Sequence, residues 1–497
     1  MNTHTRLKDF GRCFLTALLT TMAFPRLEVW GLAWIALVPF MIVLDGKTPW
    51  QGFRTGFVCG FLTFFGALYW LFHITEWFSV VAGAGVIILF FYLAVYYALF
   101  GFFYCSSHAM SPVRRLFFLP SVWAVLEFVR AHLFTGFDWI SLGHSQFRNL
   151  CSIQMADFSG VFGVSFIIVM TNYFLKEIRR RRQPFMFRCV FYAVFISHLL
   201  YGVVRLREPL PPETLRVGIV QGNVDQDMKW QEFAWPMIMK AHKTLTRQTA
   251  LKQPELIIWP ETSFPGILGE DDQLFSEIED LAREVKRPIL LGAIERKDKD
   301  YFNTVMLTDA DGNIVRKYSK IHLVPFGEFF PGRNLIGPLA KWVPIDDFTR
   351  GSDYAIFNAS GAKAFSVLIC FEDTIAGMAR PFVRRGAKLL VNMTNDAWFR
   401  DSKASTLHLS SSIFRTVENR RSLVRSANTG LSNAIDPYGR IITQIADQHG
   451  KSVNIQGYAV VDVPLNGRTT FYTKFGNAFV FLCLGYIISL FLLKRRK

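Results

Sequence analysis

The pattern of hydrophobic residues divides the chain into two apolar regions with a mixed region between them. Before residue 206 and after residue 474 the apolar residues form long runs, and the run from Ser79 to Ser107 contains no charged residue. At a helical rise of about 1.5 Å per residue, such runs are long enough to cross a bilayer core of about 30 Å. They predict eight membrane helices, at residues 10–24, 29–45, 55–73, 80–104, 116–134, 158–175, 185–204 and 475–493.

Basic residues cluster beside these runs, at 47–54, 114–115, 179–182 and 494–497. With eight crossings and the N-terminus inside the cell, all four clusters fall on the cytoplasmic side, as the positive-inside rule expects. The first two apolar runs are short and are separated by Pro25, so a re-entrant hairpin is an alternative for them. The topology predicts a membrane region of seven helices, an extracytoplasmic domain, and a last membrane helix with a cytoplasmic tail, at 1–205, 206–474 and 475–497.

The mixed region predicts an α/β domain. Short apolar runs rich in β-branched residues predict strands at 215–224, 255–260, 288–294, 303–309, 365–370, 388–392, 422–427 and 458–463. Apolar residues spaced by three and four predict helices at 231–252, 272–286, 374–386 and 404–420. Strands that alternate with helices are typical of a layered domain in which the helices cover the sheet faces.

The composition changes this picture little. Hydrophobic residues make up 51% of the chain and charged residues 19%, whereas a soluble domain carries about 25% charged residues. The net charge of +16 suggests nucleic acid, but much of the excess lies beside apolar runs, and no groove-reading or base-stacking element accompanies it. We therefore predict a membrane protein with no nucleic-acid partner.

The chain has seven cysteines, of which only Cys370 lies in the mixed region. Without a CxxC pair or a Cys/His metal spacing, neither a disulfide framework nor a zinc site is predicted. A single cysteine in a soluble domain is most often a buried apolar residue. Its neighbours must therefore decide whether Cys370 is reactive.

Three predicted strands end beside chemically active side chains. Glu261 follows an apolar run that Pro260 ends, since proline cannot continue a central strand. Lys320 lies eight residues before Glu328, and Cys370 ends an apolar run of its own. In α/β domains functional groups gather at the carboxyl ends of strands. A thiolate nucleophile, a carboxylate base and an ammonium that stabilises an oxyanion suffice for acyl transfer. Taken singly, each has a structural alternative: a surface acid, an exposed lysine and a core cysteine.

The segments around these residues resemble the nitrilase or carbon–nitrogen hydrolase superfamily. They are Trp-Pro-Glu at 259–261, Lys-Tyr-Ser-Lys-Ile-His-Leu-Val-Pro-Phe-Gly-Glu at 317–328, and Ile-Cys-Phe-Glu-Asp at 369–373. With the apolar runs around them, essentially the whole chain resembles the apolipoprotein N-acyltransferase family. The resemblance implies an α-β-β-α sandwich with Glu261 as general base, Lys320 as oxyanion stabiliser and Cys370 as nucleophile.

The same resemblance implies supporting residues. Glu328 matches a second glutamate that orients the lysine and the base. Phe371 and Glu372 match the positions after the nucleophile, and Trp230 matches a tryptophan that the family needs. The segments 395–399 and 425–430 also fit the family.

The sequence departs from the family pattern at two places that concern the edge of the site and its substrate preference. Arg400 stands where the family usually has glycine. The segment after it keeps His408 and Arg415 but replaces much of the surrounding polar pattern with leucine and serine. Neither departure affects the nucleophile.

The resemblance implies a reaction in two halves without a metal or organic cofactor. Cys370 takes an acyl chain from a phospholipid such as phosphatidylethanolamine, and the thioester passes it to the α-amine of a diacylglyceryl-cysteine on an apolipoprotein. A covalent intermediate predicts ping-pong kinetics. The implied location is the bacterial inner membrane, with the catalytic domain on the periplasmic side and the C-terminus in the cytoplasm.

Two further features have both functional and structural interpretations. The segment Phe329–Phe348 is apolar with few charges, so it is either a loop packed on the domain or a lid that dips into the membrane. Glu127 and Arg130 lie in or beside the fifth predicted membrane helix, where ionisable groups mark either a functional site or an internal ion pair.

Two alternatives to the acyltransferase remain open at this point. A membrane-tethered amidase would use the same three residues but hydrolyse the thioester. A transporter or receptor with an inactive nitrilase-like domain is the other; transporters tend to carry inverted repeats, which the sequence lacks, and an inactive domain would be expected to have lost one of the three residues.

Overall fold

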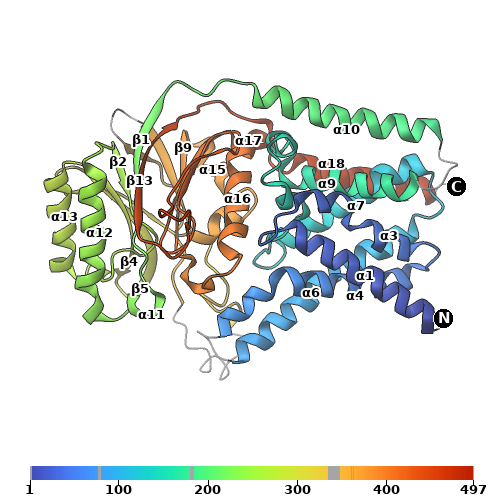
Figure 1. Cartoon of the computed structure of the whole chain (residues 1–497), viewed down its shortest axis with the longest axis horizontal. Helices are drawn as coiled ribbons and strands as arrows, with labels where there is room; N and C mark the ends of the chain where they lie inside the picture. The colour runs from blue at the N-terminus through green and yellow to red at the C-terminus, as the bar shows by residue number, and fades with distance from the viewer. Residues whose placement is uncertain are drawn as a thin grey trace. The chain divides into compact units, whose positions relative to one another are not determined.

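A computed structural model describes residues 3–75, 80–178, 184–333, 347–359, 361 and 363–495 (Figure 1). The chain divides into two compact units. The first comprises Met1–Glu208 with Thr470–Lys497, and the second Pro209–Thr469.

The first unit is helical. Its longer helices are α1 (Thr3–Ala23), α3 (Val38–Leu44), α4 (Pro49–Leu68), α6 (Val80–Ser106), α7 (Pro112–His132), α9 (Ala156–Ile178), α10 (Phe185–Leu206) and α18 (Ala478–Arg495). Short helices complete it, namely α2 (Ala33–Ala36), α8 (Leu150–Ile153) and α17 (Phe471–Phe475).

The predicted number of membrane helices is supported only in part. Four of the described helices are long and apolar enough to cross a membrane: Pro49–His73, Ala82–Ser106, Ala156–Ile178 and Phe185–Leu206. The other four predicted segments fall short for physical reasons. Charged residues interrupt α1 and α7, the second run breaks into short helices, and the apolar part of the last helix, Ala478–Leu493, is short. The described helices point to a membrane protein, but by length and composition they support four spans rather than eight.

Glycines bring α4 and α6 into close contact. Gly52, Gly56 and Gly60 lie four residues apart on one face of α4. A Cβ atom at Gly56 would lie 2.3 Å from the Tyr97 carbonyl oxygen, and one at Gly52 would lie 2.4 Å from that of Gly101. Small residues at this spacing allow helix backbones to approach, which is how membrane helices associate without a hydrophobic driving force.

Glu127 and Arg130 are buried in α7 but are not paired with each other. A Glu127 carboxylate oxygen accepts hydrogen bonds from Trp123 Nε1 at 2.8 Å and the Leu142 amide at 2.7 Å. The Arg130 guanidinium donates to Ser141 Oγ at 2.9 Å. Both side chains therefore fasten α7 to neighbouring groups, and the predicted alternative of a direct ion pair is wrong.

The second unit contains two sheets. The order of the first is β13 (Gly457–Pro464), β1 (Thr214–Gln221), β2 (Leu256–Ile258), β4 (Ile289–Lys297), β5 (Asp300–Thr308), β6 (Ile314–Ser319), with β3 (Ile267–Leu268) also on β4. The order of the second is β12 (Ile441–Gln444), β11 (Asn433–Ile435), β10 (Ser422–Ala427), β9 (Leu389–Thr394), β8 (Lys363–Ile369), β7 (Phe357–Ala359).

Helices cover the outer faces of both sheets, which gives the α-β-β-α layers visible in Figure 1. On the first sheet lie α12 (Trp235–Ala250) and α13 (Asp272–Val285), and α15 (Ala379–Arg384) and α16 (Ala404–Asn419) lie on the second. The face of α13 that bears Phe275, Ile278 and Leu281 packs with sheet residues in one apolar core, as its spacing predicts. The predicted α-β-β-α sandwich is therefore confirmed.

Parallel pairing places the candidate residues at one edge of each sheet. In the first sheet β1, β2 and β4 run parallel, and in the second β8, β9 and β10 do. The Ser426 hydroxyl of β10 donates to the Val220 carbonyl of β1 at 3.0 Å, so the two sheets are in contact. Their carboxyl ends carry Glu261, Cys370 and Asn395.

Candidate active site

Glu261 lies buried just beyond β2, and two groups hold its carboxylate. One oxygen accepts a hydrogen bond from Asn303 Nδ2 at 2.8 Å, and the other accepts one from the Asn395 amide at 2.8 Å. Gly292 of the neighbouring strand β4 makes room for this turn, because a Cβ atom there would lie 2.5 Å from the Thr262 nitrogen. A carboxylate held by two donors keeps a fixed direction, which suits a proton acceptor.

Lys320 follows β6 and connects two carboxylates. Its Nζ lies 2.9 Å from Glu328 Oε1 and 3.6 Å from Glu261 Oε1, and its side chain is almost fully buried. Asn303 Nδ2 also donates to Glu328 Oε1 at 3.0 Å, so the amide bridges the same two carboxylates. Burial alone would lower the pKa of Lys320, but Glu328 and Glu261 outweigh it and raise the pKa well above its usual range. The lysine is therefore a permanent cation at this position.

A tight turn presents Glu328 to the lysine. The Val324 amide donates to Glu328 Oε2 at 2.8 Å, and the Glu328 amide donates to the Val324 carbonyl at 2.8 Å. Within this turn Phe326 has a φ of +62°, which is uncommon for a residue other than glycine. The turn thus fixes Glu328 by its own backbone.

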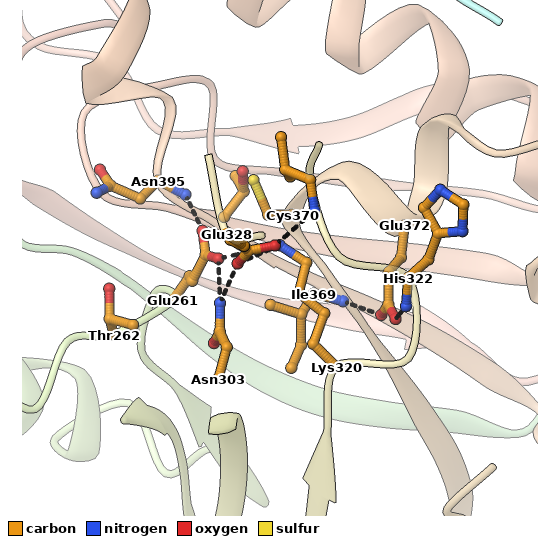
Figure 2. A network of polar contacts seen from close by, with 12 residues as sticks. Glu261, Thr262, Asn303, Lys320, His322, Glu328, Ile369, Cys370, Glu372 and Asn395 are labelled. Carbon is orange, nitrogen blue, oxygen red and sulfur yellow. Dashed lines mark hydrogen bonds and ion pairs between the residues drawn. The ribbon is translucent and has the colours of Figure 1, made fainter. Parts of the chain in front are cut away.

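Cys370 occupies a sharp bend between β8 and a short 3₁₀ helix, Cys370–Thr374. Its φ is +50°, and its carbonyl oxygen accepts from Asn392 Nδ2 at 3.0 Å. Strained backbone of this kind is concentrated at functional sites. The thiol interacts electrostatically with the Glu261 carboxylate, and Figure 2 shows both in one group of polar side chains. Burial and the Glu261 carboxylate raise the pKa of Cys370 well above its usual range, although Lys320 opposes them, so at neutral pH the resting group is a thiol. Attack then requires a base, and Glu261 is adjacent.

Glu372 connects the cysteine bend to the loop that carries Lys320. Its side chain is fully buried, and its carboxylate accepts from the Ile369 amide at 2.7 Å and the Ile321 amide at 2.8 Å (Figure 2). It also accepts from the Tyr318 hydroxyl at 2.8 Å. Burial raises the pKa of Glu372 to about 6, while these backbone donors oppose the shift. Glu372 therefore holds the nucleophile and the lysine in register.

A buried charged cluster lies behind the nucleophile. His408 Nε2 lies 2.7 Å from Asp373 Oδ1 and 3.1 Å from the Cys370 carbonyl oxygen, and Nδ1 lies 3.0 Å from Asp396 Oδ1. Arg425 Nη2 donates to Asp396 Oδ2 at 2.9 Å. Burial and Arg425 would lower the pKa of His408, but the two aspartates outweigh them and raise it to about 9. This cluster fastens α16, β9 and β10 to the bend.

The structure brings together Glu261, Lys320, Glu328 and Cys370, with Glu372 tied to the same loops. Their chemical roles stay predictions. The Phe371 ring stacks on His322 at 6.1 Å between ring centroids. The remaining supporting residue, Trp230, is 47% exposed, and its ring centroid lies 5.8 Å from Lys229 Nζ.

Arg400 adopts the backbone conformation that glycine favours. Its φ is +49°, at the position where the family usually has glycine. This backbone conformation explains why the family usually has glycine at the position of Arg400, because only glycine adopts it without steric cost. The predicted lid at Phe329–Phe348 lies largely outside the described residues, since 334–346 are not described.

Sequence reasoning missed two groups of the site. Asn303 lies within strand β5, and none of its sequence neighbours indicates a functional role for it. The Asn395 amide contributes only backbone, although the residue lies in a segment that resembled the family. Among the described residues, no group of three or more His, Cys, Asp or Glu side chains lies close enough to hold a metal ion.

Comparison with known proteins identifies two regions. Residues 16–174 match the family model of the apolipoprotein N-acyltransferase N-terminal domain, and residues 216–466 match that of carbon-nitrogen hydrolase. The chain is 34% identical to an apolipoprotein N-acyltransferase of Geobacter metallireducens, over 99% of this chain and 96% of the relative. It is 31% identical to one from Nitrosomonas europaea, over 89% and 88%. An amidase from Nesterenkonia sp. is similar in structure at a TM-score of 0.40 and 17% identity, over 55% of this chain and 98% of that chain.

Proposed function

This chain belongs to the apolipoprotein N-acyltransferase family, and on that premise we propose that it acylates lipoproteins through a thioester on Cys370. It is an acyltransferase, and N-acylation of lipoproteins is its function. The proposal adds the residues, the donor lipid and the side of the membrane.

In the first half-reaction Cys370 attacks the ester carbonyl of a phospholipid such as phosphatidylethanolamine. Glu261 takes the thiol proton, the S–C bond forms, and the Lys320 ammonium stabilises the oxyanion. The ester C–O bond then breaks, and Glu261 returns the proton to the departing lysophospholipid oxygen. The raised pKa of Cys370 supports this order, because a resting thiol needs its proton removed during attack.

In the second half-reaction the α-amine of the diacylglyceryl-cysteine attacks the thioester carbonyl. Glu261 accepts the amine proton as the C–N bond forms, and the C–S bond breaks. The proton returns to the Cys370 sulfur, which restores the thiol. Because lysophospholipid leaves before the lipoprotein reacts, ping-pong kinetics follow.

The observation that carries the proposal is the ion pair of Lys320 with two carboxylates beside a strained cysteine. Nζ contacts at 2.9 and 3.6 Å hold the ammonium between Glu328 and Glu261. A cation whose direction is fixed before reaction stabilises developing charge without reorganisation. This preorganisation supports acyl chemistry at Cys370.

The membrane setting supports lipid substrates. The chain is a membrane protein, and we propose that its second unit lies on the periplasmic side of a bacterial inner membrane, with eight crossings and a cytoplasmic C-terminus. Both substrates are lipids that remain in the bilayer. A site attached to membrane helices receives their acyl chains without extracting them into water.

Intact-protein mass spectrometry tests the proposal directly. Purified full-length protein is incubated with phosphatidylethanolamine, alongside Cys370→Ser and the control Cys189→Ser, which changes an exposed cysteine of α10. We expect a hydroxylamine-sensitive gain of one acyl group in wild type and C189S but not in C370S. A diacylated lipopeptide should then remove it. Failure of every phospholipid to form the adduct would overturn the proposal and favour an amidase.

A further inference from the structure

Lys229 is a second buried lysine beside Glu261, and the scheme above does not use it. It ends the short helix α11 (Gln226–Lys229), and only 3% of its surface is exposed. Its ammonium donates to the Glu261 carbonyl oxygen at 3.2 Å and to the Thr262 hydroxyl. Lysine is rarely buried to this degree without a specific partner. The contacts therefore point to a role at the base.

The turn that Lys229 holds is strained. Thr262 has a φ of +43°, a marked outlier for a β-branched residue. Such a conformation persists only where surrounding contacts impose it. Figure 2 shows Thr262 on the far side of Glu261 from Cys370. Lys229 thus holds the backbone of the base from behind, while the carboxylate faces Asn303 and Asn395.

Few titratable groups surround Lys229, and one of them is the Glu261 carboxylate. Lys229 and Glu261 line a small internal cavity with His242, Thr262, Ser263 and Asn428. The titratable groups that face the ammonium are Glu261, Cys370 and His242. His242 is neutral at pH 7, because burial lowers its pKa to about 4. Burial lowers the pKa of Lys229 to about 8, although Glu261 and Cys370 oppose the shift, so the amine is mainly protonated at pH 7.

The ammonium also adds positive charge beside the base. Glu261 raises the pKa of Lys229 more than Cys370 does. Charge interactions are mutual, so the ammonium favours the ionised Glu261 carboxylate that accepts the thiol proton. In the scheme above that proton moves from Cys370 to Glu261, so the net charge of the site is unchanged and Lys229 acts through the base.

We propose that Lys229 is a positioning residue of the acyl-transfer site, whose ammonium holds the strained Glu261–Thr262 turn and so keeps the base directed at Cys370. The inference rests on the proposed thioester function. Lys229 acts through the base and does not touch the reacting carbonyl.

The test uses the full-length protein in detergent micelles, as wild type, K229M, K229R and K229Q. K229M removes the charge, K229R retains it, and K229Q retains a hydrogen-bond donor without charge. The control is K252M, which changes an exposed lysine of the same unit. Alkylation of Cys370 by iodoacetamide is followed by peptide mass spectrometry from pH 6 to 9.5. Acyl-enzyme formation from phosphatidylethanolamine is measured separately at pH 7.

We expect K229M and K229Q to slow both reactions by roughly tenfold to a hundredfold at pH 7, the range typical of a displaced catalytic group. K229R should retain most of the rate, and K252M all of it. The wild-type alkylation profile should bend near pH 8, where Lys229 loses its proton, and the bend should be absent from K229M and K229R.

Three outcomes separate the possibilities. Wild-type rates in K229M or K229Q, or a bend at pH 8 that survives in K229M, would overturn the inference. If thermal melting shows K229M to be unfolded, K229R and the wild-type bend decide the same question. If wild type forms no acyl-enzyme but K229M still slows alkylation, the proposed function fails while the role of Lys229 stands.

Discussion

Glu372 illustrates how one side chain keeps two catalytic loops in register. Its two oxygens face only donors, namely the amides of Ile369, Ile321 and His322 and the Tyr318 hydroxyl. The geometry of Cys370 relative to Lys320 therefore depends on an acceptor with two oxygens.

We expect Glu372→Gln to lower the rate of acyl-enzyme formation by on the order of 100-fold. The amide replaces one acceptor with an NH₂ group that faces other donors, so a loop must move or a buried donor lose its partner. The measurement is the rate of the acyl mass gain on Cys370. Glu284→Gln, on an exposed surface of α13, is the matched control. A wild-type rate in E372Q would show that the loops hold their register without this carboxylate.

At this scale the sequence predicted the residues that lie in recognisable segments and missed those that do not. Glu261, Lys320 and Cys370 each follow a predicted strand, so their meeting could be expected from parallel pairing. Asn303 lies within a strand, and its amide reaches the site only because β5 pairs beside β4. The role of Lys229 could not be predicted from the sequence either, since its burial depends on the packing of a short helix against the Glu261 turn.

At the scale of elements, the approach of β4 to the Glu261 turn depends on Gly292. A side chain at this position would contact the Thr262 nitrogen at 2.5 Å and the Glu261 Cα at 2.9 Å. We expect Gly292→Ala to displace the base, with a loss of roughly 1–3 kcal/mol in stability and tenfold to a hundredfold in acylation rate. Thermal melting and the acyl-enzyme assay measure the two effects. Gly467→Ala, where a Cβ atom meets nothing within 4 Å, should change neither. Full activity in G292A would contradict this account of the turn.

The cluster that fastens α16 to the cysteine bend predicts a pH-dependent stability. The pKa of His408 rises from 6.5 to about 9 in the folded protein. Because the folded pKa is the higher one, the stabilisation is complete below pH 6.5 and is lost as the pH rises through 9. Its size is on the order of 3 kcal/mol, since one pKa unit corresponds to about 1.4 kcal/mol.

We expect the wild-type melting temperature to fall between pH 6.5 and 9.5 by roughly 6–12 °C more than that of His408→Gln. Differential scanning fluorimetry of the full-length protein at the two pH values makes this measurement. His449→Gln changes an exposed histidine and should behave as wild type. Equal pH dependence in H408Q and wild type would show that His408 is not the titrating group.

The strands were easier to predict where they are buried. Continuous apolar runs predicted the central strands β1, β2, β8, β9 and β10 within a few residues of their ends. The strands not predicted include β3, β7 and β11, which have two or three residues each and no apolar run of their own. Such strands form because a neighbouring strand offers free backbone groups, which local sequence does not reveal.

At the scale of the whole molecule, apolarity alone does not decide the number of membrane helices. The prediction counted every apolar run as a crossing, yet α7 carries buried Arg115, Glu127 and Arg130 that reduce its hydropathy. Polar side chains of this kind are tolerated when they face other helices rather than lipid. The number of crossings therefore depends on packing as well as on composition.

That number decides on which side of the membrane the catalytic unit lies. If only the four long apolar helices cross, all of them before residue 206, the N-terminus and the unit Pro209–Thr469 share one side. Seven crossings before residue 206 place them on opposite sides. We expect seven, because the basic cluster at 179–182 of the sequence then follows six crossings and faces the cytoplasm, whereas with four it would follow three and face the periplasm. Alkaline phosphatase, which needs the disulfide-forming periplasm, should be active when inserted at the exposed Asp447–Gly450 turn. Green fluorescent protein at the N-terminus should fluoresce in the cytoplasm, and phosphatase fused there should be inactive. Phosphatase inactive at the turn beside a fluorescent N-terminus would place the catalytic unit in the cytoplasm and remove access to periplasmic lipoproteins.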